Sequence, residues 1–286
     1  MSEPRNPVPE PTASTAPAGL FVPVRGKVMA ITSGKGGVGK TFVSANLAAA
    51  LTRRGLKVLV LDADLGLANL DVVLNLYPKI TLHDVFSGKA TLDDAIIKAP
   101  GGFSVILAGS GLVEYSRLTL EIREEFLKLM NDIVPRYDVV LLDTGAGISD
   151  VVLFAISLAS EVLMVATPEP TSLTDAYATI KVLAAQQGRQ TVRLIVNQTV
   201  RPGDGKNIVN QLQQVLNRFL GAGAAAAGTQ VVRLLHVGDI PVDQSVKEAV
   251  MRRQLLLTHT PGSPAALAVG QIAGRIEDTV LSAEGR

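Results

Sequence analysis

The chain has 286 residues, 47% of them hydrophobic and 19% charged, which is enough to bury about three quarters of its unfolded surface in a large core. The formal net charge of +1 gives no basic surface of the kind that binds nucleic acid, so DNA is disfavoured as a partner. The absence of cysteine excludes disulfides, iron–sulfur clusters and thiol nucleophiles.

The first 25 residues differ in composition from the rest of the chain. They contain six of the 15 prolines, among Ser, Thr and Ala, which predicts a disordered tail over residues 1–25. This segment lacks the basic and then apolar order of a secretory signal, and the chain has no run of about 18 apolar residues. We therefore expect a cytoplasmic protein with one folded domain over residues 26–286.

From Gly26 onward, short apolar runs rich in Val, Leu and Ile alternate with longer segments of helical periodicity. This alternation is typical of a doubly wound α/β fold, in which a mostly parallel sheet is flanked by helices. The expected strands are residues 27–32, 57–62, 103–107, 138–143, 162–167, 191–197 and 230–235. The expected helices are residues 40–54, 117–133, 149–159, 172–187, 207–220, 242–251 and 265–281. Short helices are expected at 69–76, 82–86 and 93–97, and a flexible surface insertion at 221–228.

A glycine-rich stretch, SGKGGVGKT, lies between the first expected strand and the first expected helix. The spacing G-x-x-x-x-G-K-[ST] is fitted by Gly34, Gly39, Lys40 and Thr41. In this motif the backbone N–H groups surround and bind phosphates, and the hydroxyl of the Ser or Thr binds Mg²⁺. The helix that follows adds the positive end of its dipole. A plain glycine-rich turn is the alternative, but the strand before and the helix after the stretch favour a nucleotide site.

Two further strands end in aspartates. The strand at 57–62 runs into Asp62 and Asp64, and the strand at 138–143 ends at Asp143. Because ligands lie at the carboxyl ends of parallel strands, these carboxylates are expected beside the glycine-rich stretch. Of the pair Asp62 and Asp64, one can bind Mg²⁺ through water and the other can point at the attacking water. The four apolar residues before Asp143 are typical of a Walker B carboxylate, whose role is to bind Mg²⁺. The alternative is an Asp that caps the next helix.

Lys35 is a second lysine in the same loop, although Lys40 already supplies the charge for one phosphate. Its position suggests contact with a second nucleotide, and a solvated loop lysine is the alternative. Residues 34–41 resemble the deviant Walker A motif of the ParA/MinD family. There the first lysine crosses a dimer interface to the partner's phosphates, in the manner of an arginine finger.

Longer segments narrow the resemblance to the FlhG group of flagellar-number ATPases, also called FleN or YlxH. The similar segments are DADLGLANLD at 62–71, TLHDV at 81–85, DTGAGI at 143–148 and TPEPTSLTDAYA at 167–178. They occur in the same order as in that group, and the likeness covers residues 27 to about 276.

The resemblance implies a role for each matching residue. Lys35 would act in trans, Asp64 would orient water, and Asn197 would meet the adenine edge. The other residues of the loop, which would bind the phosphates, are Gly34, Gly36, Gly37, Val38, Gly39, Lys40 and Thr41. Those that would hold the metal are Thr41, Asp62 and Asp143. Those that would form the base pocket are Pro241 and Asp243. Residues 197–200 lack the N-K-x-D motif of proteins that recognise guanine, which favours ATP over GTP as the nucleotide.

The resemblance further implies an ATP-dependent, dimerising switch that hydrolyses ATP slowly and regulates flagellar number or placement. Its partners would be a second copy and a FlhF-type GTPase, a flagellar basal-body component or a flagellar transcription activator, with recruitment to the inner membrane or cell pole. The C-terminal segment departs from that group: residues 265–286 lack Phe and Trp, and only Arg275 and Arg286 are basic. We therefore expect a core-packing helix there, which leaves membrane attachment open.

Two other functions fit the same motifs. One is a ParA/MinD-like ATPase that positions chromosomes, the division site or another organelle. The other is a binding module whose nucleotide orders a partner surface without being hydrolysed.

Overall fold

The computed structural model describes residues 26–64, 69–109, 118–226 and 231–281. Within them, eight strands form one sheet in the order β3-β4-β2-β5-β1-β6-β7-β8. The strands are β1 Lys27–Ser33, β2 Val58–Ala63, β3 Ile97–Lys98, β4 Ser104–Ile106, β5 Val139–Ala146, β6 Glu161–Ala166, β7 Thr191–Thr199 and β8 Arg233–Pro241. All neighbouring strands are parallel except β3 and β4. The predicted doubly wound α/β fold is confirmed.

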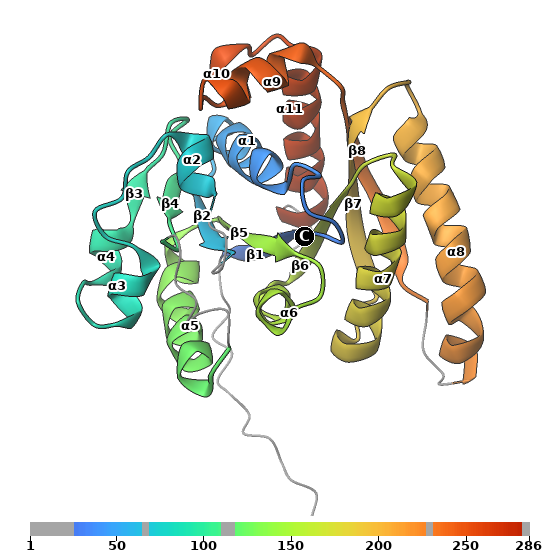
Figure 1. Ribbon diagram of the computed structural model, residues 1–286, viewed down its shortest axis with the longest axis horizontal. Helices are drawn as coiled ribbons and strands as arrows, with labels where there is room; N and C mark the ends of the chain where they lie inside the picture. Colours follow the sequence, from blue (N-terminus) through green and yellow to red (C-terminus); the bar gives the residue numbers. More distant parts are fainter. Residues whose placement is uncertain (1–25, 65–68, 110–117, 227–230, 282–286) are drawn as a thin grey trace, which may run out of the picture.

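Helices cover both faces of the sheet (Figure 1). They are α1 Lys40–Arg53, α2 Leu70–Leu74, α3 Leu82–Phe86, α4 Leu92–Ala95, α5 Leu120–Ile133, α6 Asp150–Ser157, α7 Pro170–Gln187, α8 Asp204–Ala226, α9 Gln244–Met251, α10 Leu256–His259 and α11 Pro264–Ile276. A 3₁₀ turn at Val134–Arg136 follows α5, and a π-helical turn at Glu277–Leu281 follows α11.

The sheet separates two apolar cores. One lies between the strands and α5, α6, α7 and α8, and includes Phe126, Ile156 and Leu183. The other lies between the opposite sheet face and α1, α10 and α11, and includes Leu47 and Val269. The central strands are almost continuous runs of Val, Leu and Ile because both of their faces are buried.

Local chemistry fixes several helix ends. Ser149 and Ser263 accept hydrogen bonds from backbone N–H groups in the first turns of α6 and α11. Helix α7 has Pro170 in its first turn and ends at Gly188, whose φ of 62° is left-handed.

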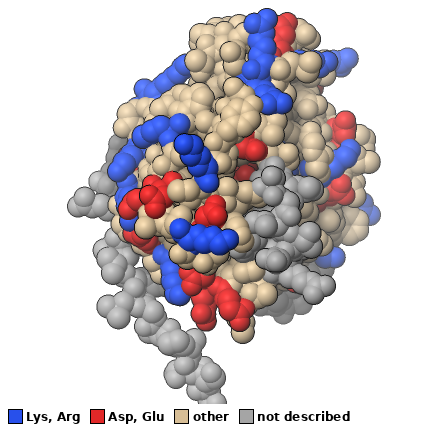
Figure 2. Space-filling view, turned by 60° about the vertical axis from the view of Figure 1, so that its left-hand side comes forward, with Lys and Arg blue, Asp and Glu red and all other residues tan. Residues whose placement is uncertain are grey.

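The C-terminal helix packs into the core, as the sequence predicted. Ala265, Val269, Ile272 and Ile276 of α11 are buried. In the described part of the chain, no helix combines the length and the apolar character needed to cross a membrane. On the molecular face shown in Figure 2, acidic and basic side chains are interspersed and neither covers it continuously.

Several predicted boundaries were wrong. Strand β8 begins at Arg233 and continues to Pro241, six residues past the predicted end, because its whole length pairs with β7. Helix α8 continues to Ala226, so the flexible insertion predicted at 221–228 is helical over 221–226, where Ala is the strongest helix former. Helix α4 ends at Ala95, and the predicted helix at 93–97 gives way to β3. The predicted tail at 1–25 lies outside the described residues.

Candidate functional site

The phosphate loop, residues 34–41, joins the carboxyl end of β1 to the start of α1. Gly37 and Gly39 have φ angles of 78° and 95°, in the left-handed region that favours glycine, and Gly39 is the N-cap of α1. Gly34 lies against α7, where a Cβ built on it would be 2.1 Å from the carbonyl carbon of Asp175. The glycines of the motif are therefore required by backbone conformation and by close approach.

Two buried carboxylates lie side by side next to this loop. Asp62 on β2 and Asp143 on β5 are register partners, and their exposed fractions are 1% and 3%. The Ser44 hydroxyl donates to Asp143 Oδ1 at 2.7 Å. Burial and the neighbouring Asp143 raise the pKa of Asp62 well above its ordinary value. Burial also raises the pKa of Asp143 to about 6, although hydrogen bonds from Ser44 and Thr41 oppose the rise.

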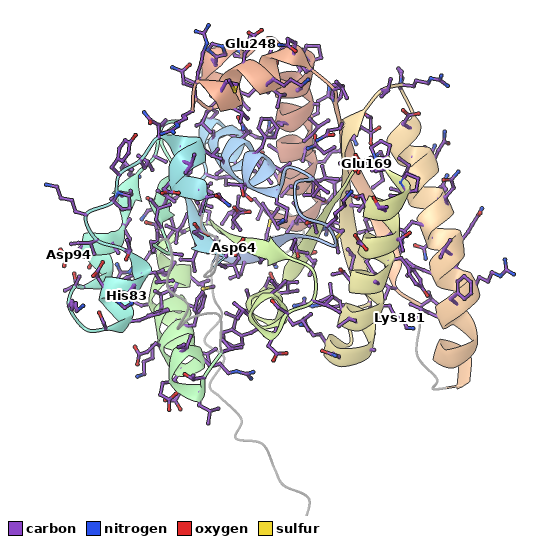
Figure 3. All side chains as sticks on the ribbon, in the orientation of Figure 1. Asp64, His83, Asp94, Glu169, Lys181 and Glu248 are labelled. Atoms are coloured by element: carbon purple, nitrogen blue, oxygen red, sulfur yellow. The ribbon has the colours of Figure 1, made fainter. Side chains whose placement is uncertain are left out.

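Asp64 follows β2 and lies in the middle of the molecule (Figure 3). Its backbone N–H donates to Asp62 Oδ1 at 3.2 Å, and a Cβ built on Gly145 would lie 3.4 Å from Asp64 Oδ1. Burial lowers the pKa of Lys40, while the negative charges of Asp143 and Asp64 counteract that lowering. The structure thus brings Lys40, Asp62, Asp64 and Asp143 together as the sequence predicted, although their roles stay predictions.

The donor set fits Mg²⁺ and phosphate. Asp62 Oδ2 is buried and has no hydrogen-bond partner within the described ranges. Buried polar atoms without partners carry a free-energy penalty that a bound ligand or its waters would relieve. No group of three or more His, Asp or Glu in the described residues is arranged to hold a metal by itself. Mg²⁺ keeps several waters and takes few carboxylates alongside phosphate oxygens, so Asp62 and Asp143 suffice in number for it.

Lys35 contacts the start of α7 in its own chain. Its Nζ donates to Glu169 Oε2 and to Thr171 Oγ1, each at 2.9 Å. Glu169 lies at the top of α7 in Figure 3. The predicted contact of Lys35 with a second nucleotide concerns a state with two copies and stays a prediction.

The residues predicted to meet the adenine edge and to form the base pocket lie near the ends of β7 and β8. Asn197 Nδ2 donates to the Val38 carbonyl at 2.8 Å. Pro241 ends β8, and Asp243 caps α9 by accepting from Ser245 N–H while also accepting from Ala265 N–H. Burial acts to raise the pKa of Asp243, but these hydrogen bonds outweigh it and the pKa is lowered. The Asp243 carboxylate therefore has a structural task, and base contact stays a prediction.

Comparison with known proteins agrees with this geometry. A family model described as an AAA domain matches residues 26–194. The antiactivator FleN of Pseudomonas aeruginosa is 42% identical over 260 residues, which cover 91% of this chain and 89% of FleN. The chain belongs to the ParA/MinD family of ATPases, close to its FlhG group.

Two more relatives extend the comparison. The flagellum site-determining protein YlxH of Helicobacter pylori is 32% identical over 250 residues, covering 87% of this chain and 81% of YlxH. The septum site-determining protein MinD of Pyrococcus horikoshii, solved in complex with Mg-ADP, superposes with a TM-score of 0.71 at 26% identity. The match covers 91% of this chain and 98% of that MinD.

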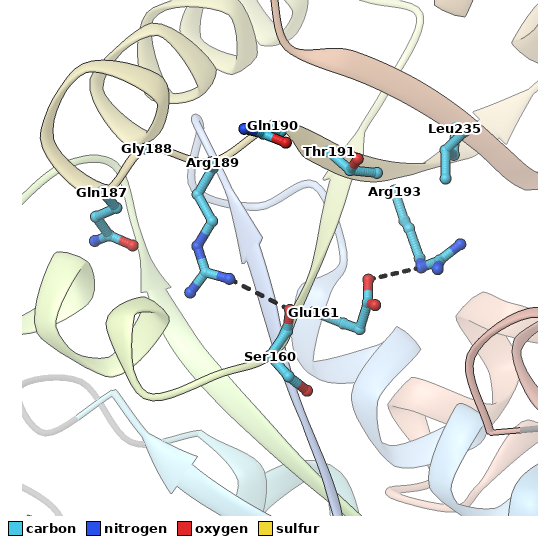
Figure 4. Close-up of a pocket in the computed structure, with 9 residues that line it drawn as sticks. All are labelled: Ser160, Glu161, Gln187, Gly188, Arg189, Gln190, Thr191, Arg193 and Leu235. Atoms are coloured by element: carbon cyan, nitrogen blue, oxygen red, sulfur yellow. Dashed lines mark hydrogen bonds and ion pairs between the residues drawn. The ribbon is translucent and has the colours of Figure 1, made fainter. Parts of the chain in front are cut away.

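A separate pocket of about 460 Å³ lies at the opposite edge of the sheet, where β6 and β7 begin (Figure 4). Arg193 Nε donates to Glu161 Oε2 at 2.9 Å, and the Arg189 guanidinium donates to the Ser160 carbonyl at 3.3 Å. The phosphate loop follows the carboxyl end of β1, which is parallel to β6. This pocket is therefore remote from the nucleotide-binding motif of the ParA/MinD family.

Sequence reasoning missed three side chains of the site. Ser44 contacts Asp143, and Glu169 and Thr171 hold Lys35. Ser44 could have been found from its place on the first helix, one turn after Thr41 and therefore on the same helix face. Glu169 and Thr171 fall within one of the segments that carried the family resemblance, but nothing local linked them to Lys35.

We expect Asp143→Asn to stabilise the nucleotide-free protein above pH 6. The folded-state pKa is about 6 and the ordinary value is 3.8, so the folded protein binds the extra proton between these values. Stability from this group consequently falls as pH rises through that window and stays lowered above it. At pH 8 the variant should be more stable by roughly 3 kcal/mol, because one pKa unit corresponds to about 1.4 kcal/mol.

Urea unfolding in EDTA at pH 4 and pH 8 measures this difference. The two proteins should converge toward pH 4, where the Asp143 carboxyl is largely protonated in the folded protein. An equal offset at both pH values would contradict the prediction.

Proposed function

We propose that this chain is an ATP-dependent molecular switch that binds Mg·ATP, dimerises face to face, hydrolyses ATP slowly and thereby regulates flagellar number or placement. One observation carries most of the proposal. The phosphate loop has two lysines, both partly buried: Lys40 lies beside Asp64 and Asp143, whereas the Lys35 ammonium contacts Glu169 and Thr171 at the start of α7. A second loop lysine that contacts α7 instead of the carboxylates of its own site favours completion of the site by a second copy.

Each residue then has a distinct task. The N–H groups of the phosphate loop and the Lys40 ammonium bind the phosphates, with the helix dipole of α1 behind them. Thr41, Asp62 and Asp143 would hold Mg²⁺, directly or through water. When bound, Mg²⁺ neutralises charge that develops on the phosphate oxygens during transfer.

Asp64 orients the attacking water by accepting a hydrogen bond from it. Its backbone N–H is fixed on Asp62, so its carboxylate is placed relative to the metal residues. The Lys35 ammonium of a second copy would stabilise the transferring phosphate, which makes hydrolysis depend on dimerisation. Pro241, Asp243 and Asn197 would surround an adenine base.

The contact of Lys35 with Glu169 does not oppose a role in trans. The two side chains are 39% and 62% exposed, and an exposed ion pair contributes only about 1 kcal/mol or less. A phosphate chain beside a buried metal attracts an ammonium far more strongly than a hydrated carboxylate does. Lys35 can therefore leave α7 when a second copy brings its nucleotide.

The similarity to FleN favours the flagellar role over chromosome or septum positioning, because FleN is 42% identical to this chain whereas the putative septum site-determining protein MinD of Guillardia theta is 34% identical. FleN is an antiactivator, so among the proposed partners we favour a flagellar transcription activator over a FlhF-type GTPase or a basal-body component. Recruitment to the inner membrane or the cell pole would use such a partner, since the apolar residues of α11 named above are buried.

Phosphate release and light scattering of the purified full chain test the proposal. In ATP and Mg²⁺ we expect the mass of a dimer. The turnover number for ATP should lie far below the value typical of enzymes, which is about 10 s⁻¹. In ADP, or in ATP with EDTA, we expect a monomer. A chain that binds ATP yet releases no phosphate, alone or with candidate partners, would instead be a non-hydrolysing binding module.

A further inference from the structure

Asn197 lies near the end of β7, which β6 separates from β1 in the sheet (Figure 1). Its side chain nevertheless reaches the phosphate loop. Nδ2 donates to the Val38 carbonyl at 2.8 Å. Both residues are buried, with exposed fractions of 6% and 3%. The hydrogen bond is therefore shielded from water and joins elements 159 residues apart.

A β-bulge aims Asn197 at the loop. Asn197 pairs with Ile240 and Thr199 pairs with Pro241, so Gln198 is an extra residue on β7. Gln198 has a φ of 61°, unusual for a residue other than glycine, and its N–H donates to Asn197 Oδ1 at 2.9 Å. Bulges next to functional sites commonly redirect a side chain, and here the Asn197 amide itself helps to hold the bulge.

The same amide packs against Gly39. A Cβ built on Gly39 would lie 2.5 Å from Asn197 Nδ2, so the amide occupies the space that a side chain would take. Gly39 is the left-handed residue from which α1 begins, and its carbonyl accepts the hydrogen bond from Val43 N–H. Asn197 thus fixes the peptide before Gly39 by a hydrogen bond and Gly39 itself by contact.

We propose that Asn197 is a positioning residue for the phosphate loop: through Val38 and Gly39 it holds the loop backbone so that the N–H groups point at the phosphates. The proposal rests on the proposed function only in taking the phosphate loop as the nucleotide site. It is separate from the adenine contact that the family resemblance implies, because one N–H and one lone pair of the amide remain for a base. A positioning role predicts that Asn197 matters for ligands that carry no base.

The experiment compares Asn197→Ala with Val200→Ala, whose exposed side chain lies three residues further along. Three ligands are titrated with Mg²⁺: inorganic tripolyphosphate, ATP and GTP. Asn197→Ala removes one partner of a buried hydrogen bond, so it should weaken the binding of all three ligands by a similar factor of about 10. The ratio of ATP to GTP affinity should stay unchanged. Val200→Ala should bind all three as the wild type does.

A second variant covers the event that Asn197→Ala does not fold. Asn197→Asp keeps the acceptor for Gln198 N–H but has no donor for the Val38 carbonyl, and Val200→Asp matches its change of charge. We expect Asn197→Asp to weaken tripolyphosphate binding much more than Val200→Asp does. Thermal melts without ligand establish that each variant is folded.

Hydrogen exchange of peptides covering residues 34–43 supplies a readout that needs no ligand. In nucleotide-free protein, exchange there should be faster in Asn197→Ala than in the wild type and Val200→Ala. Unchanged exchange, or wild-type tripolyphosphate affinity in Asn197→Ala, would overturn the inference. Loss of tripolyphosphate affinity together with a changed ATP to GTP ratio would support it and add a base contact. If exchange in the loop is faster in Asn197→Ala than in the wild type but the wild type binds no nucleotide, the proposed function is refuted while the positioning role of Asn197 stands.

Discussion

Lys35→Ala is expected to abolish ATP-dependent dimerisation and to lower phosphate release by a factor of about 10³ or more, the scale on which a cation supplied in trans acts. ATP binding should persist, because Lys40 and the backbone of the phosphate loop belong to the same chain as the nucleotide. Within the described part of the chain, the Lys35 ammonium donates its hydrogen bonds to the exposed start of α7, so loss of the side chain should leave the fold intact. The measurements are the mass in ATP and the rate of phosphate release.

Lys181→Ala is the matched control, because it removes the same charge from an exposed position further along α7 (Figure 3). It should dimerise and hydrolyse as the wild type does. Lys35→Arg should recover part of the activity if charge alone is needed, although the planar guanidinium differs in reach. A Lys35→Ala protein that dimerises normally in ATP would rule out the role in trans.

The sheet and its large helices could be predicted from the sequence because their signals are local. The apolar run of β1 followed by glycines and then by a helical pattern needs no distant contact to be recognised. The second half of β8 could not be predicted in this way. It contains Gly238, Asp239 and Pro241, which predict a loop, and pairing with β7 overrides that preference. Strand β3 has only two residues, which no periodicity can reveal.

The same distinction applies to the candidate site. Motif spacing was sufficient to bring together Lys40, Asp62, Asp64 and Asp143, because parallel strands align their carboxyl ends. The contact of Asn197 with Val38 depends on a bulge, and the contact of Lys35 with Glu169 depends on how α7 meets the loop. These are tertiary arrangements, and the sequence carries no local mark of them.

Asp64→Asn should lower phosphate release by a factor of about 10² to 10⁴, the usual contribution of a group that orients and accepts a proton from water. The amide is nearly the same size and leaves the backbone bond to Asp62 in place, so ATP and Mg²⁺ should still bind. Because dimerisation needs ATP bound and not hydrolysed, the variant should accumulate as a dimer in ATP. Light scattering over time and phosphate release measure the two effects separately.

Glu248→Gln removes a carboxylate charge on the exposed side of α9, far from Asp64 in Figure 3, and should behave as the wild type. The decisive comparison is between Lys35→Ala and Asp64→Asn. Lys35→Ala should be inactive as a monomer, whereas Asp64→Asn should be inactive as a dimer, because Lys35 assembles the site and Asp64 acts within it. An Asp64→Asn protein that releases phosphate at the wild-type rate would remove Asp64 from the mechanism, and one that is inactive but monomeric in ATP would show that Asp64 acts in assembly instead.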